Sequence, residues 1–164
     1  FSLSLPIYDC TKDLETSEEK SDELTTDKDA SSKMHDSGFV LPRLFVLVVD
    51  DAMTNRKLCM RLLERSGHRC EGACDGKEAV EMVQKSIDNG RPYDCILLDY
   101  EMPNMNGPQA CEKMRAMGCS SHIAGVTGNL MSEDVDHFRN CGANWVFPKP
   151  FRLEAVEEQW IEDG

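Results

Sequence analysis

The chain has 164 residues, of which 40% are hydrophobic, and its 30 Asp and Glu against 18 Lys and Arg give a formal charge of −12. This length supports one hydrophobic core and predicts a single globular domain. The negative charge argues against binding nucleic acid or an anionic membrane through a broad electrostatic surface.

Residues 9–42 are predicted to form a flexible acidic linker. Ten Asp or Glu and four Lys lie between Asp9 and Asp36, among repeated Ser and Thr and almost no large apolar residue. Such a segment cannot offset its ordering entropy by burial. The first eight residues, FSLSLPIY, instead alternate like a short strand, and because they lack an initial methionine we expect the chain to be cut from a longer protein.

Short apolar runs alternate with amphipathic stretches from Leu44 onward. The predicted strands are residues 44–49, 68–73, 95–98, 122–126 and 143–147. The predicted helices are residues 54–67, 75–90, 107–118, 132–142 and 152–161. Parallel strands need crossover connections, so this alternation predicts a parallel sheet with helices on both faces.

The first predicted helix has Thr54 as its N-cap and Gly67 as its terminator. Leu58, Leu62 and Leu63 share one face of this helix, which we expect to pack in the core. The apolar run before the helix, LFVLVV, is much shorter than the roughly 20 residues that a membrane-spanning helix needs. The fragment is therefore expected to make no membrane contact.

The eight cysteines include no CxxC pair, so zinc-ribbon spacing is absent. The chain is long enough to fold without disulfides, and its first residues do not resemble a signal peptide. We therefore expect reduced thiols in a cytoplasmic protein, although the parent protein could be anchored in a membrane.

Polar side chains follow four of the five predicted strands. They are Asp50 and Asp51, Asp99, Thr127, and Lys149. Each one alone has a simple explanation as a turn former, a helix cap or a solvated side chain. Because ligands of such sheets bind outside the carboxyl ends of the strands, their joint placement predicts a functional site.

The chemistry of this set favours phosphoryl transfer. Three neighbouring carboxylates repel one another and are tolerated mainly around a hard divalent cation such as Mg²⁺. Asp99, at the centre, can act as a carboxylate nucleophile toward phosphorus. Lys149 and the cation would neutralise the phosphoryl oxygens, and Thr127 would donate a hydrogen bond to one of them.

Four motifs resemble those of the receiver domain of two-component phosphorelays, in the same order and at similar separations. They are VLVVDD, ILLDYEMPNMNG, GVTGN and VFPKPF, spread over residues 44 to about 161. The resemblance implies a receiver domain at 43–164 with a flavodoxin-like (βα)5 doubly wound α/β fold, in which a five-stranded parallel sheet has the order 2-1-3-4-5.

The same resemblance implies a role for each acidic position. Asp99 would be the phosphoacceptor, and Asp50, Asp51, Asp99 and the backbone carbonyl of Glu101 would bind Mg²⁺, with Mn²⁺ as a possible substitute. Asn106 stands where the family commonly has aspartate. We interpret it as a neutral substitution in a turn before glycine.

On the opposite side of the site, Thr127 would be the switch hydroxyl and Lys149 the phosphate clamp, with a cis Lys149-Pro150 bond. The family usually has an aromatic switch residue where this chain has Val146, while Trp145 stands one position earlier. Two interpretations stay open: the switch works with an aliphatic side chain, or the output passes through the fourth helix and its loop.

FSLSLPIY also resembles the closing strand of the ATP-binding domain of sensor histidine kinases. This resemblance implies that residues 1–8 are the tail of such a domain and that the chain is the C-terminal receiver of a hybrid histidine kinase. Its phosphodonor would be a phosphohistidine of the kinase, and its acceptor a histidine phosphotransfer protein. The fragment itself has no glycine-rich nucleotide loop and no kinase motif.

Partner contacts are expected at Met53 and Pro150, beside the predicted site. The four histidines are expected to be ordinary surface or strand-edge residues: His35, His68, His122 and His137. Two other functions fit part of the pattern. One is a pseudo-receiver that binds partners without phosphorylation, and the other is a haloacid-dehalogenase-type phosphatase with Glu101 as its general acid.

Overall fold

Five strands and five helices alternate along residues 42–163, the part of the chain that this computed structural model describes. The strands are β1 (Phe45–Val49), β2 (Arg69–Ala73), β3 (Cys95–Asp99), β4 (His122–Thr127) and β5 (Trp145–Pro148). The helices are α1 (Met53–Arg65), α2 (Gly76–Asp88), α3 (Gly107–Ala116), α4 (Ser132–Asn140) and α5 (Leu153–Asp163). The predicted kinase tail and almost all of the predicted acidic linker lie outside the described residues.

All neighbouring strands pair in parallel, and their order is β2-β1-β3-β4-β5. The predicted flavodoxin-like fold and strand order are therefore confirmed. Among the described residues, every helix is too short or too polar to cross a lipid bilayer.

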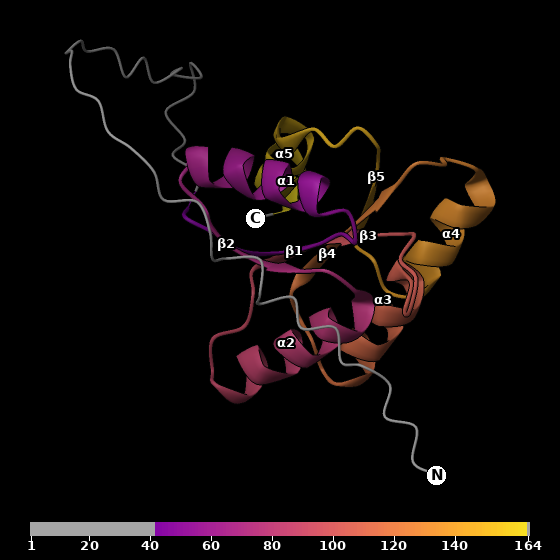
Figure 1. Cartoon of the computed structure of the whole chain (residues 1–164), viewed down its shortest axis with the longest axis horizontal. Coiled ribbons are helices and arrows are strands. Elements are labelled where there is room, and N and C mark those ends of the chain that lie inside the picture. Colours follow the sequence, from indigo (N-terminus) through magenta and orange to yellow (C-terminus); the bar gives the residue numbers. More distant parts are fainter. Residues whose placement is uncertain (1–41, 164) are drawn as a thin grey trace, which may run out of the picture. The chain divides into compact units, whose positions relative to one another are not determined.

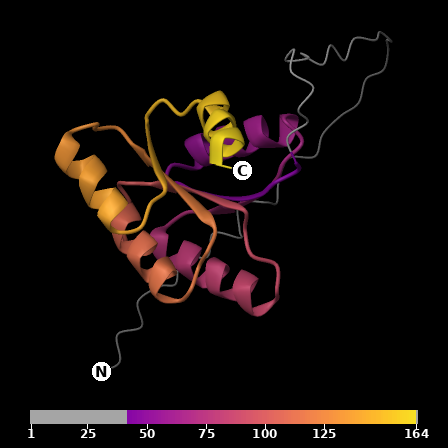
Figure 2. The same ribbon diagram turned by 180° about the vertical axis from the view of Figure 1, so that it is seen from behind.

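Helices cover both faces of the sheet: α1 and α5 lie on one face, and α2, α3 and α4 lie on the other (Figure 1; Figure 2). Along β1, Val46 and Val48 pack into the cluster that contains Leu63 of α1, whereas Leu47 and Val49 pack into the cluster beneath α2, α3 and α4. Burial on both faces explains why the central strands are continuously apolar rather than alternating.

Helix α1 begins earlier than predicted. Its N-cap is Ala52 and not Thr54, which lies inside the first turn. The backbone N–H of Ala52 donates to a carboxylate oxygen of Asp50 at 2.8 Å. Because Asp50 holds the entry to the helix in this way, no side-chain cap at Thr54 is needed.

The expected apolar face of α1 is only partly correct. Leu63 is buried at 2% exposure, but Leu58 is 58% exposed, so its assignment to the core is wrong. Leu58 and the half-buried Leu62 line a cavity of about 430 Å³ together with Val126 and Phe151.

The helix ends follow the predicted signals more closely. Gly67 and Gly90, just beyond α1 and α2, have φ values of +91° and +66°, a region that favours glycine. Asp75, the predicted start of the second helix, is the N-cap of α2. Asn106 is the N-cap of α3 and forms a capping box with Gln109. The substitution at position 106 therefore supports the helix start as well as the turn.

Two expectations about individual side chains need comment. Of the two alternatives for His68, surface or strand edge, only the second fits: the residue directly precedes the edge strand β2 but is 4% exposed, because its ring accepts the Leu44 N–H at 3.2 Å and contacts Glu157 of α5 at 3.3 Å. Cys74 is disulfide-bonded, so the reduced-thiol prediction is wrong for that residue. The free thiols among the described residues are Cys59, Cys70, Cys95, Cys111, Cys119 and Cys141.

Candidate functional site

Three carboxylates meet at the carboxyl end of the sheet. Asp50 and Asp51 follow β1, and Asp99 ends β3, the strand beside it. The two strands pair with Val49 opposite Leu98, so the register brings the acids together. Carboxylate oxygens from all three residues lie within 4.8 Å of one another. The site predicted from the strand ends is therefore a real cluster in space.

Lys149 supplies a positive charge to this cluster. Its Nζ lies 2.8 Å from Asp99 Oδ2 and 3.9 Å from Asp50 Oδ2. Its backbone N–H donates to the carbonyl of Thr127 at 2.8 Å, which fixes the residue beside the end of β4. The Lys149-Pro150 peptide bond is cis. One ammonium facing three carboxylates leaves the cluster short of positive charge.

Asp99 is the most enclosed member of the cluster, with 3% of its surface exposed. The pKa of its carboxyl group is raised above the ordinary value, chiefly by burial and also by the charge of Asp50. The hydrogen bond and the positive charge of Lys149 act in the opposite direction and lower this pKa. The backbone N–H of Glu101 approaches Asp99 Oδ1 at 3.4 Å. Lys149 is therefore the main group that favours the ionised, nucleophilic form.

Thr127 is buried beside the cluster at the end of β4. Its hydroxyl donates to the carbonyl of Asn129 at 3.0 Å and accepts the Asn129 backbone N–H at 3.1 Å. The Asn129 side chain donates to Asp134 of α4 at 2.9 Å, and the Tyr100 hydroxyl donates to the same carboxylate at 3.2 Å. This network joins the residue that follows Asp99 to the loop that follows Thr127.

The sequence did not reveal this network. Tyr100 and Asp134 stand 34 positions apart, and nothing in either local motif pairs them. The available signal was weaker: an acidic residue in the first turn of α4 and a tyrosine directly after the central aspartate. Only the packing of α4 against α3 and β5 brings them together.

Trp145 does not replace the aromatic residue that is missing at position 146. Trp145 belongs to the core cluster beneath α1 and α5, where it stacks on His122 at 5.0 Å, whereas Val146 packs on the opposite face of the sheet. Neighbouring residues of a strand point to opposite faces of the sheet. A rotamer change therefore cannot bring the Trp145 ring to the face on which Val146 lies.

Two glycines let the elements around the site approach closely. A Cβ on Gly107 would collide with the backbone carbonyl of Asp99, and a Cβ on Gly125 would collide with the ring of Phe138. Phe138 is fully buried and packs edge-on against Tyr100, with ring centroids 5.5 Å apart. These contacts hold α3 and α4 firmly against the strand ends.

The surface above the acids is hollowed. A cavity of about 520 Å³ is lined by Asp51, Asp99, Glu101, Asn106 and Lys149, together with nearby loop residues. Its polar wall consists of carboxylate, amide and ammonium groups. Hard divalent cations prefer oxygen ligands, and they often keep several waters. The residues present therefore suit a cation of the Mg²⁺ type.

The fold and this strand-end cluster define a class of protein. A family model described as the response regulator receiver domain matches residues 46–160, and the chain belongs to this family. The two-component response regulator 24 of Arabidopsis thaliana is 39% identical over 114 residues, which cover 70% of this chain and 79% of that protein.

Receivers of larger proteins are also similar. The sensor histidine kinase RcsC of Salmonella typhi is 32% identical over 134 residues, which cover 82% of this chain and 13% of the kinase. The chain thus spans a small part of such a relative. The receiver domain of the histidine kinase CKI1 from Arabidopsis thaliana, complexed with Mg²⁺ and BeF₃⁻, has a TM-score of 0.65 and 28% identity, with coverage of 74% of this chain and 91% of that chain.

A bacterial structure gives a similar result. The chemotaxis protein CheY4 of Vibrio cholerae has a TM-score of 0.64 and 27% identity, with coverage of 74% of this chain and 98% of that chain. The same fold therefore occurs in a small chemotaxis protein and in the receivers of histidine kinases.

Proposed function

We propose that this chain is a phosphoacceptor receiver that takes a phosphoryl group from a phosphohistidine onto Asp99 and then relays it. The observation that carries the proposal is the 2.8 Å contact between the Lys149 ammonium and the Asp99 carboxylate, inside a cluster of three acids. A carboxylate whose negative charge is stabilised by a neighbouring ammonium is a suitable nucleophile toward phosphorus.

In the proposed reaction, a carboxylate oxygen of Asp99 attacks phosphorus in line with the bond to the histidine nitrogen. The O–P bond forms as the P–N bond breaks, and the electron pair of the broken bond stays on the imidazole. Lys149 then pairs with a phosphoryl oxygen. Thr127 exchanges its hydrogen bond to Asn129 for one to another phosphoryl oxygen.

Asp50, Asp51, Asp99 and the backbone carbonyl of Glu101 would hold Mg²⁺, and Mn²⁺ could substitute for it. When bound, the cation neutralises negative charge on the phosphoryl oxygens. The chain's own contribution is to hold the acids at fixed separation, because Asp50 is anchored through the Ala52 N–H and Asp99 lies in the rigid core of the sheet.

The output is proposed to pass through α4 and its loop rather than through Val146. The aliphatic side chain of Val146 has no polar group that could form a hydrogen bond to Thr127 as its hydroxyl moves. By contrast, Thr127 is already hydrogen-bonded to Asn129, which in turn is bonded to Asp134 of α4. Movement of the hydroxyl toward a phosphoryl group would therefore disturb the start of α4.

The partner is proposed to be a phosphohistidine on a kinase or on a histidine phosphotransfer protein, with this chain as the receiver of a hybrid histidine kinase. The similarity to RcsC and to the CKI1 receiver supports this origin. Met53 and Leu58 are 43% and 58% exposed on α1, beside the acidic cluster. With Pro150, they offer an apolar docking surface for the histidine-bearing helix.

A small phosphodonor tests the proposal directly. The chain is incubated with acetyl phosphate and Mg²⁺, and its intact mass is measured. We expect one added phosphoryl group on the native chain and on the control Asp136→Asn, which removes an exposed carboxylate of α4. Asp99→Asn should stay unmodified.

Three results would contradict the proposal. Phosphorylation of Asp99→Asn would place the acceptor elsewhere. A native chain that binds a phosphotransfer protein but is never modified would be a pseudo-receiver. Steady release of phosphate from phosphate esters would instead indicate a phosphatase.

A further inference from the structure

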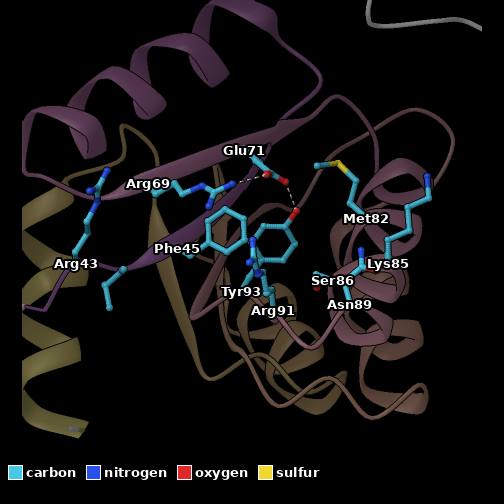
Figure 3. Close-up of a pocket in the computed structure, with 11 residues that line it drawn as sticks. Arg43, Phe45, Arg69, Glu71, Met82, Lys85, Ser86, Asn89, Arg91 and Tyr93 are labelled. Atoms are coloured by element: carbon cyan, nitrogen blue, oxygen red, sulfur yellow. Dashed lines mark hydrogen bonds and ion pairs between the residues drawn. The ribbon is translucent and has the colours of Figure 1, made fainter.

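A third cavity lies at the other end of the sheet, where β1, β2 and α2 border it (Figure 3). Its volume is about 750 Å³. We name it the basic groove. Its walls are formed by three groups of side chains: the cations Arg43, Arg69, Lys85 and Arg91, the rings Phe45 and Tyr93, and the residues Leu44, Glu71, Met82, Ser86 and Asn89.

The basic groove carries positive charge on a chain whose formal charge is −12. Arg69 is compensated, because it pairs with Glu71 at 3.6 Å. The other three cations, Arg43, Lys85 and Arg91, are exposed and form no ion pair with any residue of the described part of the chain. They come from three separate segments, so local sequence does not account for their gathering.

The floor of the groove is already fully packed. Figure 3 shows Phe45 and Tyr93 side by side, with the Arg69 side chain next to Phe45. The two ring centroids are 4.5 Å apart, and the Arg69 guanidinium lies 4.6 Å from the centroid of the Phe45 ring. The Tyr93 hydroxyl donates to Glu71 at 2.6 Å, and only 4% of Tyr93 is exposed. Because the ring faces are covered, the floor offers no platform on which a nucleobase could stack.

We propose that the basic groove is a docking surface for an acidic peptide segment of a partner protein. Three cations that have no ion-pair partner within residues 42–163 surround a concave, partly apolar floor, and they match a chain of carboxylates by charge and shape. An anionic bilayer is a poorer match, since it presents a broad plane and the remainder of this chain is strongly negative. The same overall charge opposes nucleic acid.

The groove is independent of the acidic cluster. Phe45 opens β1 and Asp50 follows its end, so the strand separates the two by about 16 Å at roughly 3.3 Å per residue. That separation is about twice the Debye length of roughly 8 Å at physiological ionic strength. Binding of an acidic segment should therefore persist in Asp99→Asn.

A labelled oligoglutamate peptide that carries one tyrosine tests the proposal, with fluorescence anisotropy as the readout on the full chain at physiological salt. We expect saturable binding that weakens with added salt. The double variant Arg43→Glu, Arg91→Glu should lose about tenfold or more in affinity. Amide resonances of Ser86, Asn89 and Tyr93 should shift when the peptide binds to the native chain.

The matched control is Lys113→Glu, Arg139→Glu, which makes the same change in charge at exposed positions of α3 and α4. It should bind like the native chain. If the charge-reversed groove variant does not fold by circular dichroism, Arg43→Gln, Arg91→Gln replaces it. No saturable binding, equal loss in the control, undiminished binding by the groove variant, or tighter binding to phosphatidylserine vesicles than to the peptide would each overturn the proposal.

Discussion

The two ends of the sheet hold clusters of opposite charge. At the carboxyl end, three carboxylates lie within 4.8 Å of one another and share the ammonium of Lys149. At the amino end, the basic groove gathers four cations around the single acid Glu71. At the carboxyl end Lys149 pairs with both Asp99 and Asp50, and in the groove Arg69 pairs with Glu71. Among the described residues, the other groove cations form no ion pair, and one ammonium serves all three carboxylates. Both ends are therefore suited to a charged ligand that the described residues do not supply.

The two ends of the sheet differ in rigidity. The carboxyl end is fixed by a network from Thr127 to α4 and by the buried ring of Phe138 against Gly125. The groove is bordered by exposed side chains that can change rotamer. Phosphoryl transfer needs fixed geometry, whereas docking of a peptide tolerates adjustable cations. The contrast fits chemistry at one end and recognition at the other.

The largest effect is expected from Lys149→Ala. It removes the ammonium that contacts Asp99, so the rate of phosphorylation by acetyl phosphate should fall by about 10²-fold or more. Mg²⁺ affinity should be kept or increased, because a repelling positive charge is lost. Intact mass measures the rate of phosphorylation, and calorimetry measures the affinity for Mg²⁺, so the two effects can be distinguished. A loss of Mg²⁺ binding equal to the loss of rate would contradict the assigned role.

Gly125→Ala tests how rigid the carboxyl end is. The new methyl group would overlap the buried ring of Phe138, and we expect the free energy of unfolding to fall by about 1–3 kcal/mol. Gly128→Ala is the matched control, since a Cβ at that position meets no atom within 4 Å. Urea unfolding measures both. Equal free energies of unfolding of the two variants would show that α4 shifts easily to make room for the methyl group. The carboxyl end would then not be the rigid end of the sheet.

Tyr93→Phe makes a milder change at the amino end. It removes the hydrogen bond to Glu71 while the packing against Phe45 stays, so we expect a loss of about 0.5–1.5 kcal/mol in the free energy of unfolding. The unpaired cations remain, and binding of the oligoglutamate peptide should be unchanged. A large drop in peptide affinity would mean that the groove depends on this hydroxyl.

The smallest effect is expected from Glu101→Asn. Its exposed side chain borders the cavity above Asp99, where it can influence how water approaches an acyl phosphate. The lifetime of the phosphorylated form should change by a few-fold, and Mg²⁺ affinity should stay nearly the same, because the backbone carbonyl is retained. Equal lifetimes in the two proteins would exclude a role for the side chain.

The sequence predicted the carboxyl end far better than the amino end. Strand periodicity and the rule for parallel sheets are enough to bring Asp50, Asp99 and Lys149 to one edge, because each follows a recognisable apolar run. The exposure of Leu58 and the burial of His68 could not be predicted, since they depend on how α1 and α5 meet. The basic groove combines side chains from distant segments, which no local pattern connects.

The acids at the carboxyl end are proposed to form a divalent-cation site that serves Asp99. A Mg²⁺ titration followed by amide resonances of the native chain and of Asp51→Asn tests it most directly. In the native chain we predict saturable shifts of the amide resonances of Asp50, Asp99 and Lys149, and no shift at Tyr93. In Asp51→Asn the shifts at the strand ends should be much smaller at the same Mg²⁺ concentration. Resonances that stay in place at the strand ends, or that move equally in both proteins, would contradict the account.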